Sequence, residues 1–277
     1  MSSILLPDCE TVTEANYHGL IAAPVEDGQP LGSGYIPRDW SVDPFGGFAA
    51  PFNLPTIPRS EWPRMIEERE AIGVTNRQLL KEFAIAPLNQ GQTNYCWCNA
   101  VVSALHIILA GQGSLFERLS PASAAAPIKG FQNRGGWGIE AVKWIAEHGI
   151  NSVDEWPANK IDKSLYTTEN KAKAARRKIT EWYDLKPNSI DQLVTCLLNG
   201  IPVALGLDWW GHEILAVDPA IENGNLVIVI QNSWGEGWGD KGLGKLSEAK
   251  ARAADQVAPR TVTPLAKSKP AQQSTVV

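Results

Sequence analysis

The spacing of apolar residues changes once along this chain, near Gly200. Before that point, apolar residues recur with the three- to four-residue spacing of helices, and Ser189 offers a typical N-cap for the last helical segment. After it, short apolar runs are bounded by Gly, Asp and Asn, at residues 202–207, 213–217 and 226–230. Because helices come first and strands follow without alternation, the sequence predicts an α+β fold with two lobes.

Two flanking segments differ in composition from the rest. Residues 1–57 are rich in Pro and Gly, which interrupt helices and strands, so we expect an extended N-terminal arm. Aromatic side chains such as Tyr35 and Trp40 recur there, which indicates an arm that lies against a surface. Residues 248–277 consist largely of Ala, Lys, Pro, Gln and Ser, and predict a polar C-terminal tail.

Residues 58–247 are expected to form the folded domain between these flanks. A helical lobe is placed at about residues 84–165 and a β lobe at about 186–247. The longest helix begins at Cys96 and is apolar through Leu109. Further helices are expected at residues 138–147, 167–183 and 189–199, the first with His148 and Gly149 as its C-terminal cap.

The overall composition argues against several classes of partner. The chain has 277 residues and a formal net charge of −5, and its basic clusters, residues 171–178 and 241–245, are short. This pattern does not predict a nucleic-acid footprint. No apolar run approaches the roughly 18 residues that a membrane span needs, and the first ten residues lack a signal-peptide pattern. We therefore expect neither nucleic acid nor a membrane as a partner.

Cysteine usage bears on the compartment and on metal binding. The chain has four cysteines, Cys9, Cys96, Cys98 and Cys196. They form no framework of the kind that staples small secreted domains, which favours a reducing, intracellular location or a place in a larger particle. No Cys-x-x-Cys pair and no His at zinc-ligand spacing accompanies them, so no metal is expected. Residues 239–245 resemble a phosphate-binding loop, but Leu246 replaces the Ser or Thr that would hold Mg²⁺, so no cofactor is expected.

Cys96 lies where a polar loop, residues 87–95, becomes the long apolar helix. The positive end of the helix dipole and the free backbone N–H groups there would lower the pKa of its thiol and stabilise a thiolate. The alternative is a buried structural cysteine, because free cysteines are among the most buried residues. For Cys98, two positions further on, a structural role is preferred.

Gln90 and Gly91 precede the pair Cys96–Trp97, and this segment resembles the papain-like cysteine peptidases. The resemblance implies a fold with a helical lobe around a central catalytic helix, an antiparallel β lobe, and a cleft between them. It also implies that Cys96 is the nucleophile and that Trp97 lines the cleft wall. The side-chain amide of Gln90 and the backbone N–H of Cys96 would then stabilise the oxyanion.

A nucleophilic thiol needs a base, and the chain contains four histidines. His106 lies ten residues along the same helix, about 15 Å from Cys96 at 1.5 Å per residue, and is too distant. His148 suits a helix C-terminus, and His18 lies in the arm. His212, at the entry of an expected strand, remains.

The segment around His212 resembles the histidine strand of the same family. The resemblance implies that Asn232 orients the His212 imidazole and that Trp234 covers the bond between them. The similarity extends over about residues 80–247 in several motifs that follow one another in the family's order. Residues 133–137 resemble the Gly-Gly strip that pairs with substrate backbone, which implies substrate-binding roles for Gly135, Gly136 and Trp137.

Glu213 departs from the family pattern. The family places a small apolar residue after the histidine, lining the pocket for the second residue before the scissile bond. A carboxylate there would favour a basic side chain, or would pair with an Arg or Lys of the same chain. The alternative is that Glu213 points to solvent at a strand edge.

The resemblance implies a cysteine peptidase that hydrolyses peptide or protein substrates through a Cys-His-Asn site. The alternative is a structural or assembly protein, for example a virus-particle component, that retains the fold. Such a protein would bind its partners through residues 1–57 and 248–277, whose composition has no evident catalytic purpose.

Overall fold

A seven-stranded sheet in the order β1-β8-β7-β6-β5-β9-β4 forms the frame of the computed structural model, which describes residues 6–43, 54–114 and 117–263. Neighbouring strands are antiparallel, except that β1 runs parallel to β8. Its strands are β1 (Thr11–Val12), β4 (Ile179–Asp184), β5 (Val203–Leu207), β6 (His212–Glu222), β7 (Asn225–Gln231), β8 (Leu243–Ser247) and β9 (Asp255–Val262). A separate hairpin pairs β2 (Val25–Glu26) with β3 (Gln29–Pro30).

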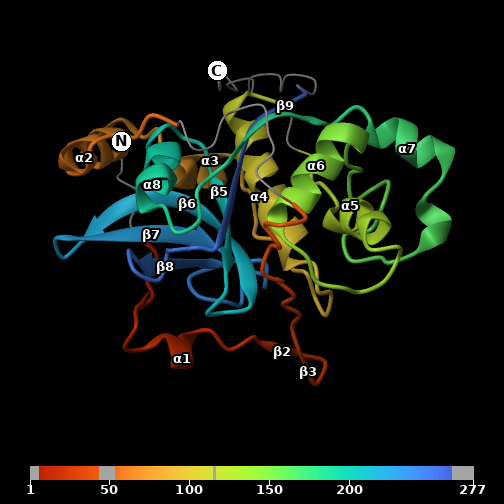
Figure 1. Ribbon diagram of the computed structural model, residues 1–277, viewed down its shortest axis with the longest axis horizontal. Helices are drawn as coiled ribbons and strands as arrows, with labels where there is room; N and C mark the ends of the chain where they lie inside the picture. Colours follow the sequence, from red (N-terminus) through yellow and green to blue (C-terminus); the bar gives the residue numbers. More distant parts are fainter. Residues whose placement is uncertain (1–5, 44–53, 115–116, 264–277) are drawn as a thin grey trace, which may run out of the picture.

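Helices cover the sheet and form a lobe of their own beside it (Figure 1). They are α1 (Tyr17–Leu20), α2 (Trp62–Ile72), α3 (Asn76–Glu82), α4 (Cys96–Gly111), α5 (Pro121–Ile128), α6 (Gly138–His148), α7 (Thr168–Ala174) and α8 (Ile190–Leu198), with short 3₁₀ turns η2 (Arg59–Glu61) and η3 (Lys163–Leu165). The capping signals act as the sequence predicts. Ser189 accepts a hydrogen bond from the Gln192 N–H at the start of α8, and α6 ends at Gly149 with φ 83°.

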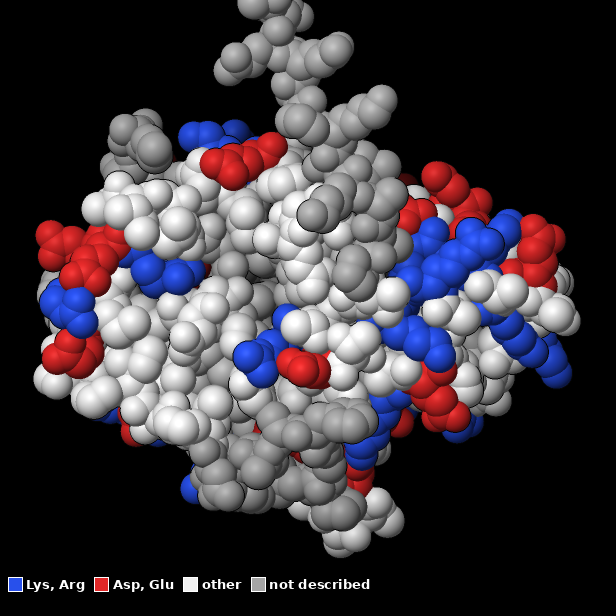
Figure 2. Space-filling model, turned by 90° about the horizontal axis from the view of Figure 1, so that it is seen from above, with Lys and Arg blue, Asp and Glu red and all other residues white. Residues whose placement is uncertain are grey.

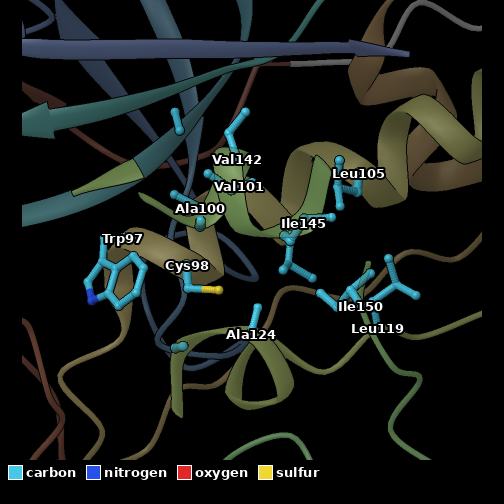
Figure 3. Close-up of a cluster of buried hydrophobic side chains, with 14 of the residues drawn as sticks. Trp97, Cys98, Ala100, Val101, Leu105, Leu119, Ala124, Val142, Ile145 and Ile150 are labelled. Atoms are coloured by element: carbon cyan, nitrogen blue, oxygen red, sulfur yellow. The ribbon is translucent and has the colours of Figure 1, made fainter. Parts of the chain in front are cut away.

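The core of the helical lobe lies between α4, α5 and α6. Val101 and Leu105 of α4 face Val142 and Ile145 of α6, and all four side chains are completely buried (Figure 3). Burial of a side chain of this size stabilises the fold by about 1.5–3 kcal/mol. This packing fixes the direction of α4 and therefore the position of its first residue, Cys96.

A second core lies where α2 and α8 pack against the sheet. It contains Ile214 and Ala216 of β6, whereas Leu215 and Val217 of the same strand pack with residues of α4. Because successive side chains of a strand point to opposite faces, α4 lies on one face of the sheet and the second core on the other. The central helix, the helical lobe and the mostly antiparallel sheet confirm the predicted two-lobed α+β fold.

Two expectations about secondary structure are wrong. Residues 255–262, placed in the polar tail, form β9 between β5 and β4. Its composition did not predict a buried strand, because its first residues, Asp255 and Gln256, are polar. Both are nevertheless only 1% exposed. The helix expected at 167–183 ends at Ala174 and is followed by β4, whose β-branched and aromatic residues favour a strand. Residues 264–277 of the expected tail lie outside the described residues.

The N-terminal arm is mostly irregular, with a few short elements (red to orange in Figure 1). It includes β1, which joins the edge of the main sheet, and the β2–β3 hairpin. Residues 1–5 and 44–53 of the predicted arm lie outside the described residues. Within the described part, residues 32–38 cross the face where Cys96 and His212 lie, as the contacts below show.

Charged side chains of both signs share the molecular surface. In Figure 2, Lys and Arg gather on the side where α7 lies, bordered by Asp and Glu. Lys173 bonds Glu169 at 2.7 Å, and Arg177 bonds both Glu117 and Glu155. Two residues of the basic cluster at 171–178 are therefore paired with carboxylates, as on a solvated face. The expected absence of nucleic-acid binding stays a prediction.

Among the helices that the structure describes, none is both long and apolar enough to cross a membrane. Nor does the described part of the chain gather three or more His, Cys, Asp or Glu side chains into a group that could hold a metal ion.

Candidate active site

Cys96 is the first residue of α4 and is completely buried. Burial raises the pKa of its thiol well above the ordinary value, and the nearby charge of Glu213 raises it further. Backbone N–H groups of Glu213, Trp97 and Tyr35 act in the opposite direction. The expectation of a lowered pKa is therefore wrong for this arrangement of the chain, because desolvation outweighs the helix N-terminus.

His212 and Asn232 are brought together as the resemblance implies. Nε2 of His212 donates to Oδ1 of Asn232 at 2.8 Å, and the indole of Trp234 stacks on the imidazole with ring centroids 4.4 Å apart. Burial lowers the pKa of His212 to about 4. The ring is therefore neutral at pH 7, with Nδ1 as the acceptor nitrogen, because Nε2 carries the proton.

Cys96 lies close to His212 but is not bonded to it. The backbone N–H of Glu213, the residue after His212, interacts with the Cys96 sulfur. Nδ1 of His212 is buried and has no hydrogen-bond partner among the described residues. The structure therefore brings the two groups into one neighbourhood without a thiol–imidazole hydrogen bond.

Gln90 points its amide at the arm. Its Nε2 donates to the carbonyl oxygens of Gly32 at 2.9 Å and Thr93 at 2.8 Å. The same Gly32 oxygen accepts the indole N–H of Trp234 at 2.8 Å. Oε1 of Gln90 accepts a bond from the Ser233 hydroxyl at 2.5 Å, which sets the orientation of the amide. The Gln90 amide, which the resemblance assigns to the oxyanion, is therefore already bonded to a carbonyl oxygen of the arm.

Gly136 pairs with the arm through its backbone. Its N–H donates to the carbonyl oxygen of Gly34 at 3.0 Å, and its own carbonyl oxygen accepts from the N–H of Ile36 at 3.0 Å. The two segments run parallel where Tyr35 faces Gly136. A Cβ at Gly135 would overlap the carbonyl oxygen of Gly34, so glycine permits this close approach. The strip predicted to bind substrate backbone binds the arm here.

The two tryptophans predicted at the site have different surroundings. Trp97 is completely buried in the core of the helical lobe, with its indole N–H bonded to the Asn94 carbonyl oxygen, and its expected place on the cleft wall stays a prediction. Trp137 is the N-cap residue of α6 and donates its indole N–H to Asp43 of the arm at 3.0 Å. The ammonium group of Lys129 lies over both rings, at 4.9 and 5.3 Å from their centroids.

Glu213 is completely buried, so the alternative that it points to solvent at a strand edge is wrong. It lies on β6, between β5 and β7, and pairs with Gly206 of β5. A Cβ at Gly138 would overlap its Oε1, which shows that the carboxyl group faces the start of α6. Burial raises the pKa of Glu213 well above the ordinary range.

Three residues of the site escaped the sequence analysis. Ser233 holds Gln90, Gly32 presents its carbonyl oxygen to Gln90 and Trp234, and Tyr35 lies beside Cys96. Ser233 follows Asn232 directly, and this adjacency is the signal that would have drawn attention to it. The recurring aromatic residues of the arm indicated a covered surface but not which one.

His106 is buried in α4 and accepts the backbone N–H of Leu119 through Nε2 at 3.0 Å. Burial, followed by the charge of Arg118, lowers its pKa to about 3. Because the unfolded chain takes up a proton near pH 6.5, this group makes the fold less stable as the pH falls from about 6.5 toward 3. The free energy of unfolding should therefore fall between pH 7 and pH 4. We expect this fall to be about 3 kcal/mol smaller in His106→Gln, which keeps a hydrogen-bond acceptor, than in the unchanged chain. Urea unfolding at both pH values measures this difference, and equal losses would contradict it.

Comparison with known proteins supports this reading of the fold. No family model matches the chain. The chain is 24% identical to mouse cathepsin K over 199 residues, covering 62% of this chain and 59% of that protein. It is 26% identical to papain from Carica papaya over 177 residues, covering 57% and 50%. The chain thus matches between half and two thirds of the length of these relatives and of rat cathepsin J.

Solved structures share the architecture. The cysteine protease xylellain from Xylella fastidiosa superposes with a TM-score of 0.59 at 17% identity, covering 86% of this chain and 99% of that one. Digestive procathepsin L 3 from Tenebrio molitor gives 0.57 at 21% identity, covering 66% and 68%. The chain therefore has the papain-like fold. Together with the curated relatives, this supports the papain-like cysteine peptidase family for the chain. None of the proteins named here supports a structural or assembly protein.

Proposed function

We propose that the chain is a papain-like cysteine peptidase that hydrolyses peptide bonds through Cys96, His212 and Asn232. The observation that carries this proposal is the buried His212–Asn232 bond beneath Trp234, beside the first residue of α4. An imidazole with one nitrogen held by an amide oxygen and the other unpartnered among the described residues suits a base that takes a thiol proton.

In the proposed reaction, the Cys96 thiol gives its proton to Nδ1 of His212 and the sulfur attacks the peptide carbonyl carbon. The backbone N–H of Cys96 and the amide of Gln90 stabilise the oxyanion. His212 then passes the proton to the departing amine, which leaves a thioester on Cys96. Water, deprotonated by His212, attacks this thioester and releases the acid, restoring the thiol. Asn232 keeps the imidazole in the required orientation.

Substrate backbone would bind along Gly135 and Gly136, with Trp137 at the end of the strip, and Glu213 would line a neighbouring pocket. Because Gly34 and Ile36 already bond this strip, and Gly32 takes the Gln90 amide, the arm and a substrate compete for the same groups. Cys96 is a buried, neutral thiol in the state in which the arm covers the site. Turnover in this proposal therefore requires the arm to leave the cleft.

The nucleophile is tested by Cys96→Ala, which we expect to abolish both peptide hydrolysis and labelling by a thiol-directed epoxide. Cys98→Ala is the matched control, because Cys98 is equally buried but donates its thiol proton to the Pro121 carbonyl oxygen, away from His212. We expect the control to retain hydrolysis and labelling. Fluorogenic peptide hydrolysis and intact-protein mass spectrometry measure the two outcomes. Full activity of Cys96→Ala would contradict the proposal.

A further inference from the structure

Arg38 of the arm lies at the centre of a buried acidic cluster. Its Nη1 and Nη2 donate to the two carboxylate oxygens of Asp184 at 2.8 and 2.9 Å, and Nη1 also donates to Asp255 at 3.2 Å. The Arg38 and Asp184 side chains are 0% exposed and that of Asp255 is 1% exposed. This two-pronged contact matches the planar guanidinium group, whereas a lysine ammonium group cannot reproduce it.

The cation and its acceptors belong to different parts of the molecule. Asp184 ends β4 and Asp255 begins β9, and these strands are neighbours in the main sheet. Arg38 lies on the arm, three residues after Tyr35, which pairs with Gly136. The acceptors therefore stay in place when the arm moves, while Arg38 leaves with it.

The cluster has more acceptor capacity than Arg38 uses. Oδ2 of Asp255 and both carboxyl oxygens of Glu213 are buried without a hydrogen-bond partner among the described residues. Burial raises the pKa of Asp255 to about 6, although Arg38 acts in the opposite direction. Burial and the charge of Asp255 raise the pKa of Glu213 as well. Asp184 and Asp255 thus share one guanidinium, with Glu213 close to Asp255. Without the guanidinium, the buried charge of these two aspartates would be left uncompensated, which is strongly unfavourable.

The cluster adjoins the candidate active site. Glu213 follows His212, and its N–H interacts with the Cys96 sulfur. Burial raises the pKa of the Tyr35 hydroxyl, and the charges of Asp255 and Glu213 raise it further, which places that hydroxyl beside these carboxyl groups. A peptide that replaces the arm along Gly136 would therefore bring a side chain to the cluster.

We propose that Asp184 and Asp255, with Glu213 beside Asp255, form a guanidinium-binding site that selects peptides containing arginine. Arg38 occupies this site as an internal ligand while the arm lies in the cleft. The inference rests on the proposed function, because the peptide takes the place of the arm at the catalytic cleft.

The test measures binding rather than turnover, in the full chain carrying Arg38→Gln and Cys96→Ala. Calorimetry compares a blocked arginine peptide amide with the same peptide containing citrulline, which has the same shape but no charge. We expect the arginine peptide to bind about tenfold or more tightly, with lysine between the two, because a hydrogen-bonded charge pair is gained. Adding Asp255→Asn should remove most of this preference.

The matched control is Arg64→Gln with Cys96→Ala. Arg64 is an exposed arginine on α2 paired with Glu61 and Glu68, so this variant keeps Arg38 in the site. We expect it to bind the arginine peptide at least about tenfold more weakly than the Arg38→Gln variant does. Equal affinity of the Arg38→Gln variant for the arginine and citrulline peptides would overturn the inference.

Failure of this inference is distinguishable from failure of the proposed function. If Arg38→Gln with Cys96 intact hydrolyses arginine and citrulline peptides equally well, the peptidase activity is supported and the guanidinium-binding site is contradicted. If the arginine peptide binds selectively but is not hydrolysed, the guanidinium-binding site is supported and the peptidase activity is contradicted.

A second measurement uses the unchanged chain, in case Arg38→Gln does not fold. Arg38 is tethered, so its effective concentration at the site is roughly millimolar, and methylguanidine is added above this concentration. Cys96 alkylation is then followed by mass spectrometry. We expect methylguanidine to compete with Arg38 and accelerate alkylation severalfold, whereas neutral methylurea has no effect. The same alkylation rate with both compounds would overturn the inference.

Discussion

Gly32→Ala is expected to raise the rate of Cys96 alkylation by about a hundredfold. A Cβ at Gly32 would overlap the backbone carbonyl oxygen of Thr93, a contact that no change of side-chain rotamer can relieve. The backbone shift would also break the bonds that the Gly32 oxygen accepts from Gln90 and Trp234. Two hydrogen bonds at about 1 kcal/mol each, with about 1 kcal/mol of strain, favour the open arm by about 3 kcal/mol.

Gly19→Ala is the matched control for this experiment. Gly19 also lies in the arm, but a Cβ there meets no atom within 4 Å, so the arm should stay in place. Alkylation is followed by intact mass spectrometry well below the unfolding temperature, which separates arm opening from global unfolding. An unchanged alkylation rate in a folded Gly32→Ala variant would show that the arm does not control access to Cys96.

His212→Ala is expected to lower peptide turnover by about 10³- to 10⁴-fold when introduced into the Gly32→Ala background. Without the imidazole, the Cys96 thiol loses the proposed acceptor of its proton, and the departing amine loses its proton donor. The loss should appear in kcat rather than in KM, because the Gly135–Gly136 strip is untouched. A Cys96 that retained rapid turnover without His212 would require a different base.

His148→Ala serves as the comparison for His212→Ala. His148 ends α6 and its side chain is partly exposed, so we expect turnover within about twofold of the background. Asn232→Ala should fall between the two, because Asn232 orients the imidazole without exchanging protons. Measuring kcat and KM for all three variants with one fluorogenic peptide places them in order.

Local signals predicted much of the fold. The polar loop before Cys96 and the apolar run after it indicated the start of α4, and the caps at Ser189 and Gly149 set the ends of two helices. Each of these features depends on residues within a few positions of one another, which is why a linear pattern reveals them. The strand beginning at His212 was indicated in the same way.

Contacts between distant segments could not be predicted in this way. Arg38 and Asp184 are 146 residues apart in the sequence and read separately as ordinary surface residues. Asp255 lay in a segment whose polar composition indicated a tail, yet it begins a buried strand. A buried polar residue is stabilised by its partner, so it carries no signal until the partner is known.

The sequence by itself determined which side chains are available for chemistry, namely one cysteine at a helix start, one histidine at a strand start, and an Asn and a Gln in matching motifs. Only the tertiary structure decided their state. The arm covers Cys96, takes the Gln90 amide and places a guanidinium among buried carboxyl groups. The physical reason is that the pKa and accessibility of a group depend on desolvation, and desolvation depends on which distant segment folds over it.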